Sequence, residues 1–417
     1  MRRIVILLSG FAALWLLCQC EKNLSPLDSG DRTPPQLRPL SEVEQQIIRA
    51  DNSFGLKLFQ RILTEEADTN MFISPLSVSM ALGMTMNGAA AETYEEMKNT
   101  LEFAGLSEQE INEGYKSLIE LLVNLDEKVL FEIANSIWYR NTFTVHQPFL
   151  ETNQFYFNAE IYPMDFNLPS APDIINQWVS DKTHEKIKKV IERINPLTVM
   201  FLINAVYFKG DWLYQFDEEF TFDDVFYKAS NQAVDCKMMN IRSQFEYYED
   251  EFLQIIDLPY GDGLFSMTIF LPRYGRDLNA FIQSLDGAQL QDYLQGLTAD
   301  SVSVSLPKFK VEYTKTLNDV LIAMGMPRAF DPDASDFSRI NPGPDLYISN
   351  VLHKTFVQVD EVGTEAAAVT VIEIGVTSEG PRMTFMRMDH PFFFLIRERE
   401  SNALLFMGKI NEPQWDD

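Results

Sequence analysis

Residues 359–376, Val-Asp-Glu-Val-Gly-Thr-Glu-Ala-Ala-Ala-Val-Thr-Val-Ile-Glu-Ile-Gly-Val, are the stretch of this 417-residue chain from which its fold can be argued. From Thr364 onward the side chains alternate with the period of two that is typical of a β-strand, and no proline interrupts them. One face is uncharged and begins with small residues, whereas Glu365 and Glu373 share the other face. Glu-Ala-Ala-Ala also favours a helix, but the β-branched residues that follow oppose one. The pattern predicts a strand that could insert between others, with an ordinary buried or edge strand as the alternative.

The sequence that follows is typical of an exposed loop. Residues 377–385, Thr-Ser-Glu-Gly-Pro-Arg-Met-Thr-Phe, mix small, polar and turn-forming types. We therefore expect a strand-like arm, residues 363–376, that leads into an accessible peptide.

Four further blocks accompany the arm. They are residues 70–78 (Asn-Met-Phe-Ile-Ser-Pro-Leu-Ser-Val), 201–210 (Phe-Leu-Ile-Asn-Ala-Val-Tyr-Phe-Lys-Gly), 389–396 (Asp-His-Pro-Phe-Phe-Phe-Leu-Ile) and 404–410 (Leu-Leu-Phe-Met-Gly-Lys-Ile). In this order the blocks resemble the serpin family of serine protease inhibitors, and Glu361–Thr370 resembles the hinge of its reactive-centre loop. The resemblance covers residues 42–412.

Periodicity and the resemblance agree on the fold class. Apolar residues recur at helical spacing at Ile47, Phe54, Leu58 and Ile62, and the sequence predicts further helices over 111–125 and 172–191. Strand-like runs come later, at 200–208, 252–258, 265–271, 301–306 and 392–396. This order favours an α+β fold. The resemblance implies a serpin fold with three β-sheets, eight or nine helices and an exposed reactive-centre loop.

The resemblance also assigns polar residues to the central sheet. Beneath the point where strands must part, it implies a sheet-opening cluster of Ser74, Ser77, Asn204 and His353. At the top of the sheet it implies Trp212 and an ion pair between Lys308 and Glu361. Considered singly, Ser74 could be only a helix N-cap and His353 only a core histidine that has a hydrogen-bond partner.

For the arm, the resemblance implies suicide-substrate inhibition. A serine protease would form an acyl-enzyme at a loop bond, and the cut arm would insert into the central sheet before hydrolysis; serpin loop insertion is itself a standard example of strand addition. The hinge residues implied are Glu361, Gly363, Thr364, Glu365, Ala366, Ala367, Ala368 and Thr370.

The scissile bond is placed by spacing. Counting from the hinge gives Thr377-Ser378, with cleavage after Val376 as the runner-up. Counting back from Pro391 gives Gly380-Pro381, a bond that most serine proteases would resist. The small and β-branched residues near Thr377 favour an elastase-like target.

Acidic residues dominate the charge of the chain. There are 61 acidic and 34 basic residues, for a net charge of −27 at pH 7. This charge disfavours nucleic acids and anionic membrane surfaces as partners. The 46 % of hydrophobic residues is ample for a large core.

Residues 1–20 have the features of a targeting segment: Arg2-Arg3, an apolar stretch and Cys18-Gln19-Cys20. They predict a bacterial lipoprotein signal with the lipid on Cys20, or on Cys18 as the runner-up; a secretory signal or a short membrane anchor are alternatives. Residues 21–41 predict a proline-rich tether and residues 42–417 a single domain with one cysteine, Cys236. The expected location is the cell envelope, lipid-anchored or secreted.

The sequence carries no recognisable catalytic or metal-binding motif. His184-Glu185 lacks a second histidine at metalloprotease spacing, and no Gly-x-Ser-x-Gly elbow, phosphate-binding loop or paired-cysteine site occurs. His146 and His184 are expected at the surface, and His390 is expected to make structural hydrogen bonds. We therefore expect no enzyme and no cofactor, but a monomer whose partner is a serine protease.

Two other functions stay open. A noninhibitory serpin-fold binding protein is one, and a hinge that cannot insert would distinguish it. Val362 and Val369 depart from the usual hinge residues, but the resemblance implies larger hinge disruptions in noninhibitory members. An inhibitor of cysteine proteases is the other, because the same loop mechanism would serve.

Overall fold

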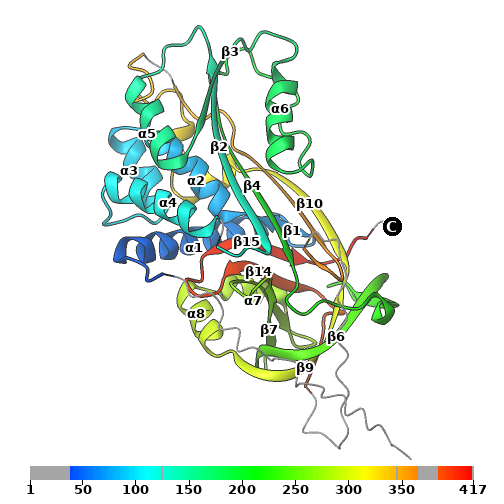
Figure 1. The fold of residues 1–417 in the computed structure, drawn as a ribbon. Helices are drawn as coiled ribbons and strands as arrows, with labels where there is room; N and C mark the ends of the chain where they lie inside the picture. Colours follow the sequence, from blue (N-terminus) through cyan, green and yellow to red (C-terminus); the bar gives the residue numbers. More distant parts are fainter. Residues whose placement is uncertain (1–37, 124, 344–345, 365–383, 416–417) are drawn as a thin grey trace, which may run out of the picture.

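The computed structural model describes residues 38–123, 125–343, 346–364 and 384–415, which fold into a mixed α+β structure (Figure 1). These residues contain nine α-helices and two 3-10 helices. The α-helices are α1 (Glu42–Leu63), α2 (Pro75–Met86), α3 (Ala91–Thr100), α4 (Glu108–Leu122), α5 (Gln147–Phe157), α6 (Ala171–Lys182), α7 (Leu278–Ser284), α8 (Gly287–Gln295) and α9 (Asn318–Met324). The 3-10 helices are η1 (Glu218–Phe220) and η2 (Pro327–Phe330). None of the described helices is long and apolar enough to cross a membrane.

Fifteen strands are described, and backbone pairing joins them into two networks. The six-stranded network has the order β10-β11-β12-β4-β2-β3, with β2 (Val129–Arg140), β3 (Glu160–Met164), β4 (Met200–Asp211), β10 (Phe309–Thr316), β11 (Leu352–Val359) and β12 (Gly363–Thr364). The nine-stranded network has the order β1-β15-β14-β8-β7-β6-β9-β13, with β5 paired to β6. Its strands are β1 (Met71–Ile73), β5 (Phe222–Tyr227), β6 (Ala233–Glu249), β7 (Leu253–Tyr260), β8 (Phe265–Pro272), β9 (Thr298–Pro307), β13 (Thr384–Arg387), β14 (Phe392–Glu398) and β15 (Leu404–Ile410).

Strand β6 explains how two networks agree with the three sheets expected. It is 17 residues long; its first residues pair with β5, residues 238–247 pair with β9, and only residues 246–249 pair with β7. Dividing the larger network near the end of β6 therefore separates a sheet of β5, β6, β9 and β13 from one built around β7, β8, β14 and β15. Together with the six-stranded sheet, these are the three sheets of the serpin fold.

Helix α2 lies between the sheets and is apolar on nearly all sides. Ser74 caps it by accepting a hydrogen bond from the backbone N–H of Ser77, and Pro75 occupies its first turn. The helix packs against both β4 and β15, and most of its side chains are buried. A helix without a polar face is stable only inside a protein, so α2 is the buried support of the six-stranded sheet.

Helix α6 is shorter than the sequence predicted. The helix expected over 172–191 ends at Lys182, because His184 and Glu185 both adopt positive φ angles, 47° and 63°. The chain then turns back, and the side chain of Asn176 accepts hydrogen bonds from the N–H groups of Val190 and Ile191 at 2.8 Å each. The apolar residues beyond the helix therefore pack as an irregular segment.

The N-terminal end of the described chain is attached to the domain. Arg38 pairs with Glu44, and Ser41 forms a capping box with Glu44 at the start of α1. The targeting segment 1–20, including Cys18 and Cys20, and most of the predicted tether lie outside the described residues.

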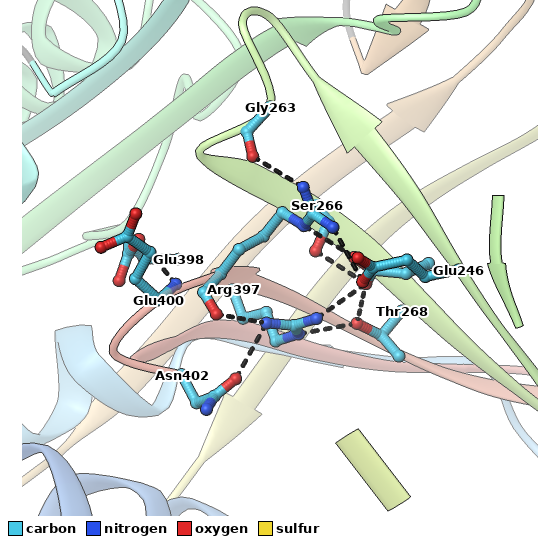
Figure 2. A network of polar contacts seen from close by, with 10 residues as sticks. Glu246, Gly263, Ser266, Thr268, Arg397, Glu398, Glu400 and Asn402 are labelled. Atoms are coloured by element: carbon cyan, nitrogen blue, oxygen red, sulfur yellow. Dashed lines mark hydrogen bonds and ion pairs between the residues drawn. The ribbon is translucent and has the colours of Figure 1, made fainter. Parts of the chain in front are cut away.

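A buried ionic network ties β7, β8 and β14 together (Figure 2). Asp257 accepts hydrogen bonds from Arg397 at 3.0 Å and Arg399 at 2.9 Å, and also from Ser266 and Thr268. Burial opposes ionisation of Asp257, but the two guanidinium groups outweigh it and hold the pKa of this carboxyl below its ordinary value. With its acceptors satisfied, the network joins three strands rigidly.

A second buried carboxylate, Asp51 on α1, has no cation beside it. Its Oδ1 accepts hydrogen bonds from Ser79 on α2 and Tyr115 on α4, and its buried Oδ2 has no partner. Burial outweighs these two hydrogen bonds and raises the pKa of Asp51 to about 7. Three helices therefore meet at an acid that is protonated below neutral pH.

We expect Asp51→Asn to stabilise the protein at pH 8 far more than at pH 4.5. The folded-state pKa of Asp51 lies above its unfolded value, so its favourable contribution is present below pH ~4 and is lost as the pH rises through about 7. The neutral amide avoids this loss in the free energy of unfolding, which is at most on the order of 3 to 4 kcal/mol.

Apparent unfolding midpoints in urea at both pH values measure the difference, with Asp173→Asn on the exposed face of α6 as the matched control. An equal shift at both pH values would show that Asp51 is already ionised in the folded protein.

Candidate functional site

The six-stranded sheet contains a slot between β4 and β11. These two strands lie on either side of β12, which pairs Thr364 with Val359 of β11 and with Gly210 of β4. Strand β12 has only two residues, whereas β11 has eight and β4 has twelve. Among the described residues, no backbone pairing joins β4 to β11 beyond β12. The first two residues of the arm thus occupy the head of a slot one strand wide.

A cavity of about 510 Å³ occupies the slot beyond β12. It is large enough for roughly seventeen waters at about 30 Å³ each, so it is no packing defect. Its walls are β4 and β11, its floor is α2, and Val179 of α6 and the segment that follows α6 lie over it. In Figure 1, α2 and α6 are seen on either side of β2 and β4. The cavity is therefore a channel between two sheet strands with a helix on each face.

All four residues of the sheet-opening cluster line this cavity, and hydrogen bonds join three of them. The Ser74 N–H donates to Nε2 of His353 at 3.0 Å, the Ser74 hydroxyl donates to the Leu405 carbonyl at 2.8 Å, and the Ser77 N–H donates to the Ser74 hydroxyl. Each of these bonds joins a backbone group to a side chain, and none joins two side chains. The cluster therefore fixes the start of α2 to β11 and β15.

Asn204 lines the same cavity but has a different partner. Its Nδ2 donates to Oδ1 of Asn135 on the neighbouring strand β2 at 2.8 Å. Its buried Oδ1 has no hydrogen-bond partner. An unsatisfied acceptor costs free energy. Asn204 is therefore able to accept a donor that enters or reshapes the slot.

His353 is neutral in this arrangement. Nε2 accepts the hydrogen bond from Ser74, which places the proton of the neutral ring on Nδ1. Burial lowers its pKa to about 4. Its contribution to stability is complete above pH ~6.5 and is lost as the pH falls towards 4. Acid therefore favours any state in which His353 reaches water.

Polar contacts hold the turn that leads into β12. Lys308 forms an ion pair with Glu361 at 2.8 Å, and the hydroxyl of Thr221 donates to the same carboxylate at 2.9 Å. Burial opposes ionisation of Glu361, but the ion pair and hydrogen bond from Lys308, together with hydrogen bonds from a backbone N–H and from Thr221, outweigh it and lower the pKa of this carboxyl. Trp212 donates from its backbone to the Val362 carbonyl at 2.7 Å and from its ring to the Asp360 carbonyl at 2.9 Å.

Gly363 and Thr364 fit the head of the slot for separate reasons. A Cβ on Gly363 would lie 2.2 Å from the carbonyl oxygen of Gly210, a contact no side chain can make. Thr364 is buried and forms a hydrogen bond of 2.6 Å with the hydroxyl of Tyr260, which stacks on Trp212 with ring centroids 4.4 Å apart. The side chain of Thr364 thus points inward, towards the core.

Tyr260 and Asn135 are contacts of the site that sequence reasoning missed. Tyr260 lies just beyond the strand predicted over 252–258, and Asn135 lies in a strand that was not predicted. No local motif marks either residue, because each becomes a neighbour of the site only through strand pairing.

Several predicted site residues lie outside the described residues: Glu365, Ala366, Ala367, Ala368, Thr370, Val376, Thr377 and Ser378. Of the histidines, His390 bonds to Asp389 and to the Pro272 carbonyl, while His184 pairs with Glu132 at the surface. The described part of the chain contains no group of three or more His, Cys, Asp or Glu residues placed to hold a metal ion.

Comparison with known proteins gives a consistent result. Residues 49–413 match the serpin (serine protease inhibitor) family. Intracellular coagulation inhibitor 2 of Tachypleus tridentatus is 34 % identical over 370 residues, which cover 87 % of this chain and 90 % of that protein. Native tengpin, a thermophilic serpin, superposes with a TM-score of 0.82 at 34 % identity, covering 91 % of this chain and 96 % of that one. Human thyroxine-binding globulin superposes with a TM-score of 0.81 at 27 % identity, covering 89 % and 100 %. The chain belongs to the serpin family.

Proposed function

We propose that this protein is a suicide-substrate inhibitor of elastase-like serine proteases. The observation that carries the proposal is the slot between β4 and β11, whose head holds Gly363 and Thr364. Serpins are generally inhibitors of proteases rather than catalysts, and a similar protein of Tachypleus tridentatus is named a coagulation inhibitor.

The direction of β12 supports insertion of the arm. The chain leaves β11, turns over residues 360–362 and returns as β12, antiparallel to both β11 and β4. An arm that continued in this direction would run down the slot with a neighbour on each side. The fourteen residues 363–376 at ~3.3 Å each span roughly 45 Å, so insertion would carry a protease bound at Thr377 across the domain.

The face of Thr364 accounts for the small residues of the arm. Because side chains alternate along a strand, an inserted arm that continued from Thr364 would turn Ala366, Ala368 and Thr370 to the same inward face. That face would lie over α2 and the cavity, where bulky or charged side chains would clash or lose hydration. Glu365 would point outward to water.

Insertion has a sufficient driving force. About a dozen new ladder hydrogen bonds at ~1 kcal/mol net each are comparable with the whole stability of a domain, ~5 to 15 kcal/mol. The form with an unfilled slot is then metastable.

The acyl-enzyme intermediate has two competing outcomes, hydrolysis by water and trapping by insertion of the arm. The protease serine oxygen bonds to the carbonyl carbon of Thr377, and the amine of Ser378 leaves with a proton. Water then releases the protease unless insertion comes first and disrupts its active site. The small and β-branched residues before the bond favour an elastase-like pocket, and a cysteine protease could enter the same race.

A noninhibitory binding protein is the second candidate, since thyroxine-binding globulin shares the fold with a TM-score of 0.81.

We further propose that the inhibitor is a monomer held at a bacterial cell envelope by a lipid on Cys20, or secreted, so that it meets proteases outside the cytoplasm.

Thr364→Arg is expected to be cleaved by elastase without trapping it. The arginine does not fit the buried position beside Tyr260, so it would displace β12 from the head of the slot. Insertion of the rest of the arm is then slower than hydrolysis of the acyl-enzyme. A denaturing gel would show a covalent band near the summed masses for the wild type and only cleaved chain for the variant, with mass spectrometry locating the cut after Thr377 or Val376.

The matched control is Glu365→Arg, which would put the same side chain on the outward face of an inserted arm and should still trap protease. Full trapping by Thr364→Arg would refute insertion through this slot. A wild type that is cleaved without a covalent band and without a rise in melting temperature would favour the noninhibitory candidate.

Gly363→Ala is expected to displace β12 from the head of the slot. The added Cβ would overlap the Gly210 carbonyl, at a cost of ~1 to 3 kcal/mol. The number of inhibitor molecules consumed per trapped protease should rise severalfold, as titration of residual elastase activity measures. Gly287→Ala, whose Cβ would meet open space, should leave this number unchanged; an unchanged number for Gly363→Ala would show that β12 is not needed.

A further inference from the structure

An exposed segment lies between the two ends of the reactive loop. Residues 213–222, which we call the 213–222 strip, follow β4 and lead into β5. At the start of the loop, the Phe216 N–H donates to the Glu361 carbonyl at 2.9 Å and Thr221 bonds to the Glu361 side chain. The strip is thereby fixed to the residue from which the arm departs.

The strip is fixed near the other end of the loop as well. Tyr214 packs edge-on against Phe245 of β6, which pairs with Asp300 of β9. Asp300 in turn accepts a hydrogen bond at 2.7 Å from Thr384, the first described residue after the loop. Because the strip is linked to the described residues at both ends of the loop, a protease bound to the loop would come close to it.

The strip combines exposed aromatic rings with negative charge. Phe220 and Phe222 are each 55 % exposed and Tyr214 is 40 % exposed. Asp217 caps η1, while Glu218 and Glu219 are exposed and enter no ion pair with any described residue. The strip itself contains no basic residue. Exposed aromatic rings mark protein-binding surfaces, and unpaired acids beside them favour a partner of positive charge.

We propose that the 213–222 strip is a second docking site for the target protease, and that it selects proteases with a basic, partly apolar surface beside the active-site cleft. This inference rests on the proposed function in one respect: a protease must bind the loop, whether or not it is then trapped. Glu218 and Glu219 would speed encounter with a basic protease by long-range attraction, and Phe220 and Phe222 would bury their rings against it. The strip would set which elastase-type enzyme is captured, while the loop sets which bond is cut.

Two paired variants test the proposal in the full-length protein. Glu218→Gln with Glu219→Gln removes the charge, and Phe220→Ser with Phe222→Ser removes the rings. Glu95→Gln with Glu113→Gln, two exposed acids on α3 and α4, is the matched control; Figure 1 places these helices away from β6 and β9. Equal melting temperatures confirm that each variant is folded.

The measurement is the association rate constant for covalent complex formation at 50 and 500 mM NaCl, with one strongly basic and one near-neutral elastase. Neutralising the strip should slow capture of the basic enzyme about tenfold at 50 mM salt and little at 500 mM. It should not change capture of the near-neutral enzyme. The serine pair should slow capture of the basic enzyme at both salt concentrations. Rates equal to those of the control pair would overturn the proposal.

The same variants in a Thr364→Arg background separate this inference from the proposed function. There the chain serves only as a substrate, and kcat/KM for loop cleavage by the basic enzyme reports docking without trapping. A tenfold fall in kcat/KM upholds the docking site even if the wild type traps no protease. An unchanged kcat/KM rejects the docking site even if trapping is complete.

Discussion

The structure depends on the backbone edges of β4 and β11. Backbone N–H and C=O groups in a sheet need partners, and these two strands share only the two residues of β12 along their facing edges. A further strand between β4 and β11 would best supply hydrogen-bond partners for these backbone groups. The turn after β11 directs the chain into this opening, where Gly363 and Thr364 already pair with β4 and Thr364 with β11. The position of the hinge and the cavity beyond it follow from that one incomplete pairing, and the proposed metastability would follow from it as well.

Buried polar contacts hold the strands and the helix that surround the slot. The Asp257 network locks β7, β8 and β14 (Figure 2), and α2 is anchored at its first turn by Ser74 to β15 and to His353 of β11. Tyr260 links the two regions, since it belongs to β7 and yet bonds to Thr364. A strand that enters the slot therefore meets a fixed floor, and its binding free energy is not spent on reshaping the core.

Sequence alone predicted the helical stripe of α1, because that pattern depends on neighbouring residues only, and the family blocks supplied the residues of the sheet-opening cluster. Of the strand-like arm, only Gly363 and Thr364 lie among the described residues, so the strand beyond them stays a prediction. The helix over 172–191 was too long because its apolar spacing continues past His184, where the backbone turns to satisfy Asn176. Asp51, Asn135 and Tyr260 were missed because their partners are far away in sequence. Local sequence patterns do not predict which polar groups will be buried or which residues will be their partners, because both depend on contacts between distant parts of the chain.

The two buried titratable groups on either side of α2 have opposite effects on proton exchange. Asp51 holds a proton in the folded protein up to pH about 7, and His353 has lost its proton down to pH about 4. In an unfolded chain at pH 5 to 6 the aspartate is ionised and the histidine is charged. Folding therefore binds one proton at Asp51 on α1 and releases one from His353 on β11, so the net exchange of protons with solvent is close to zero. For these two residues, the stability of the folded protein is nearly independent of pH across a mildly acidic range, although each alone would make it pH-sensitive.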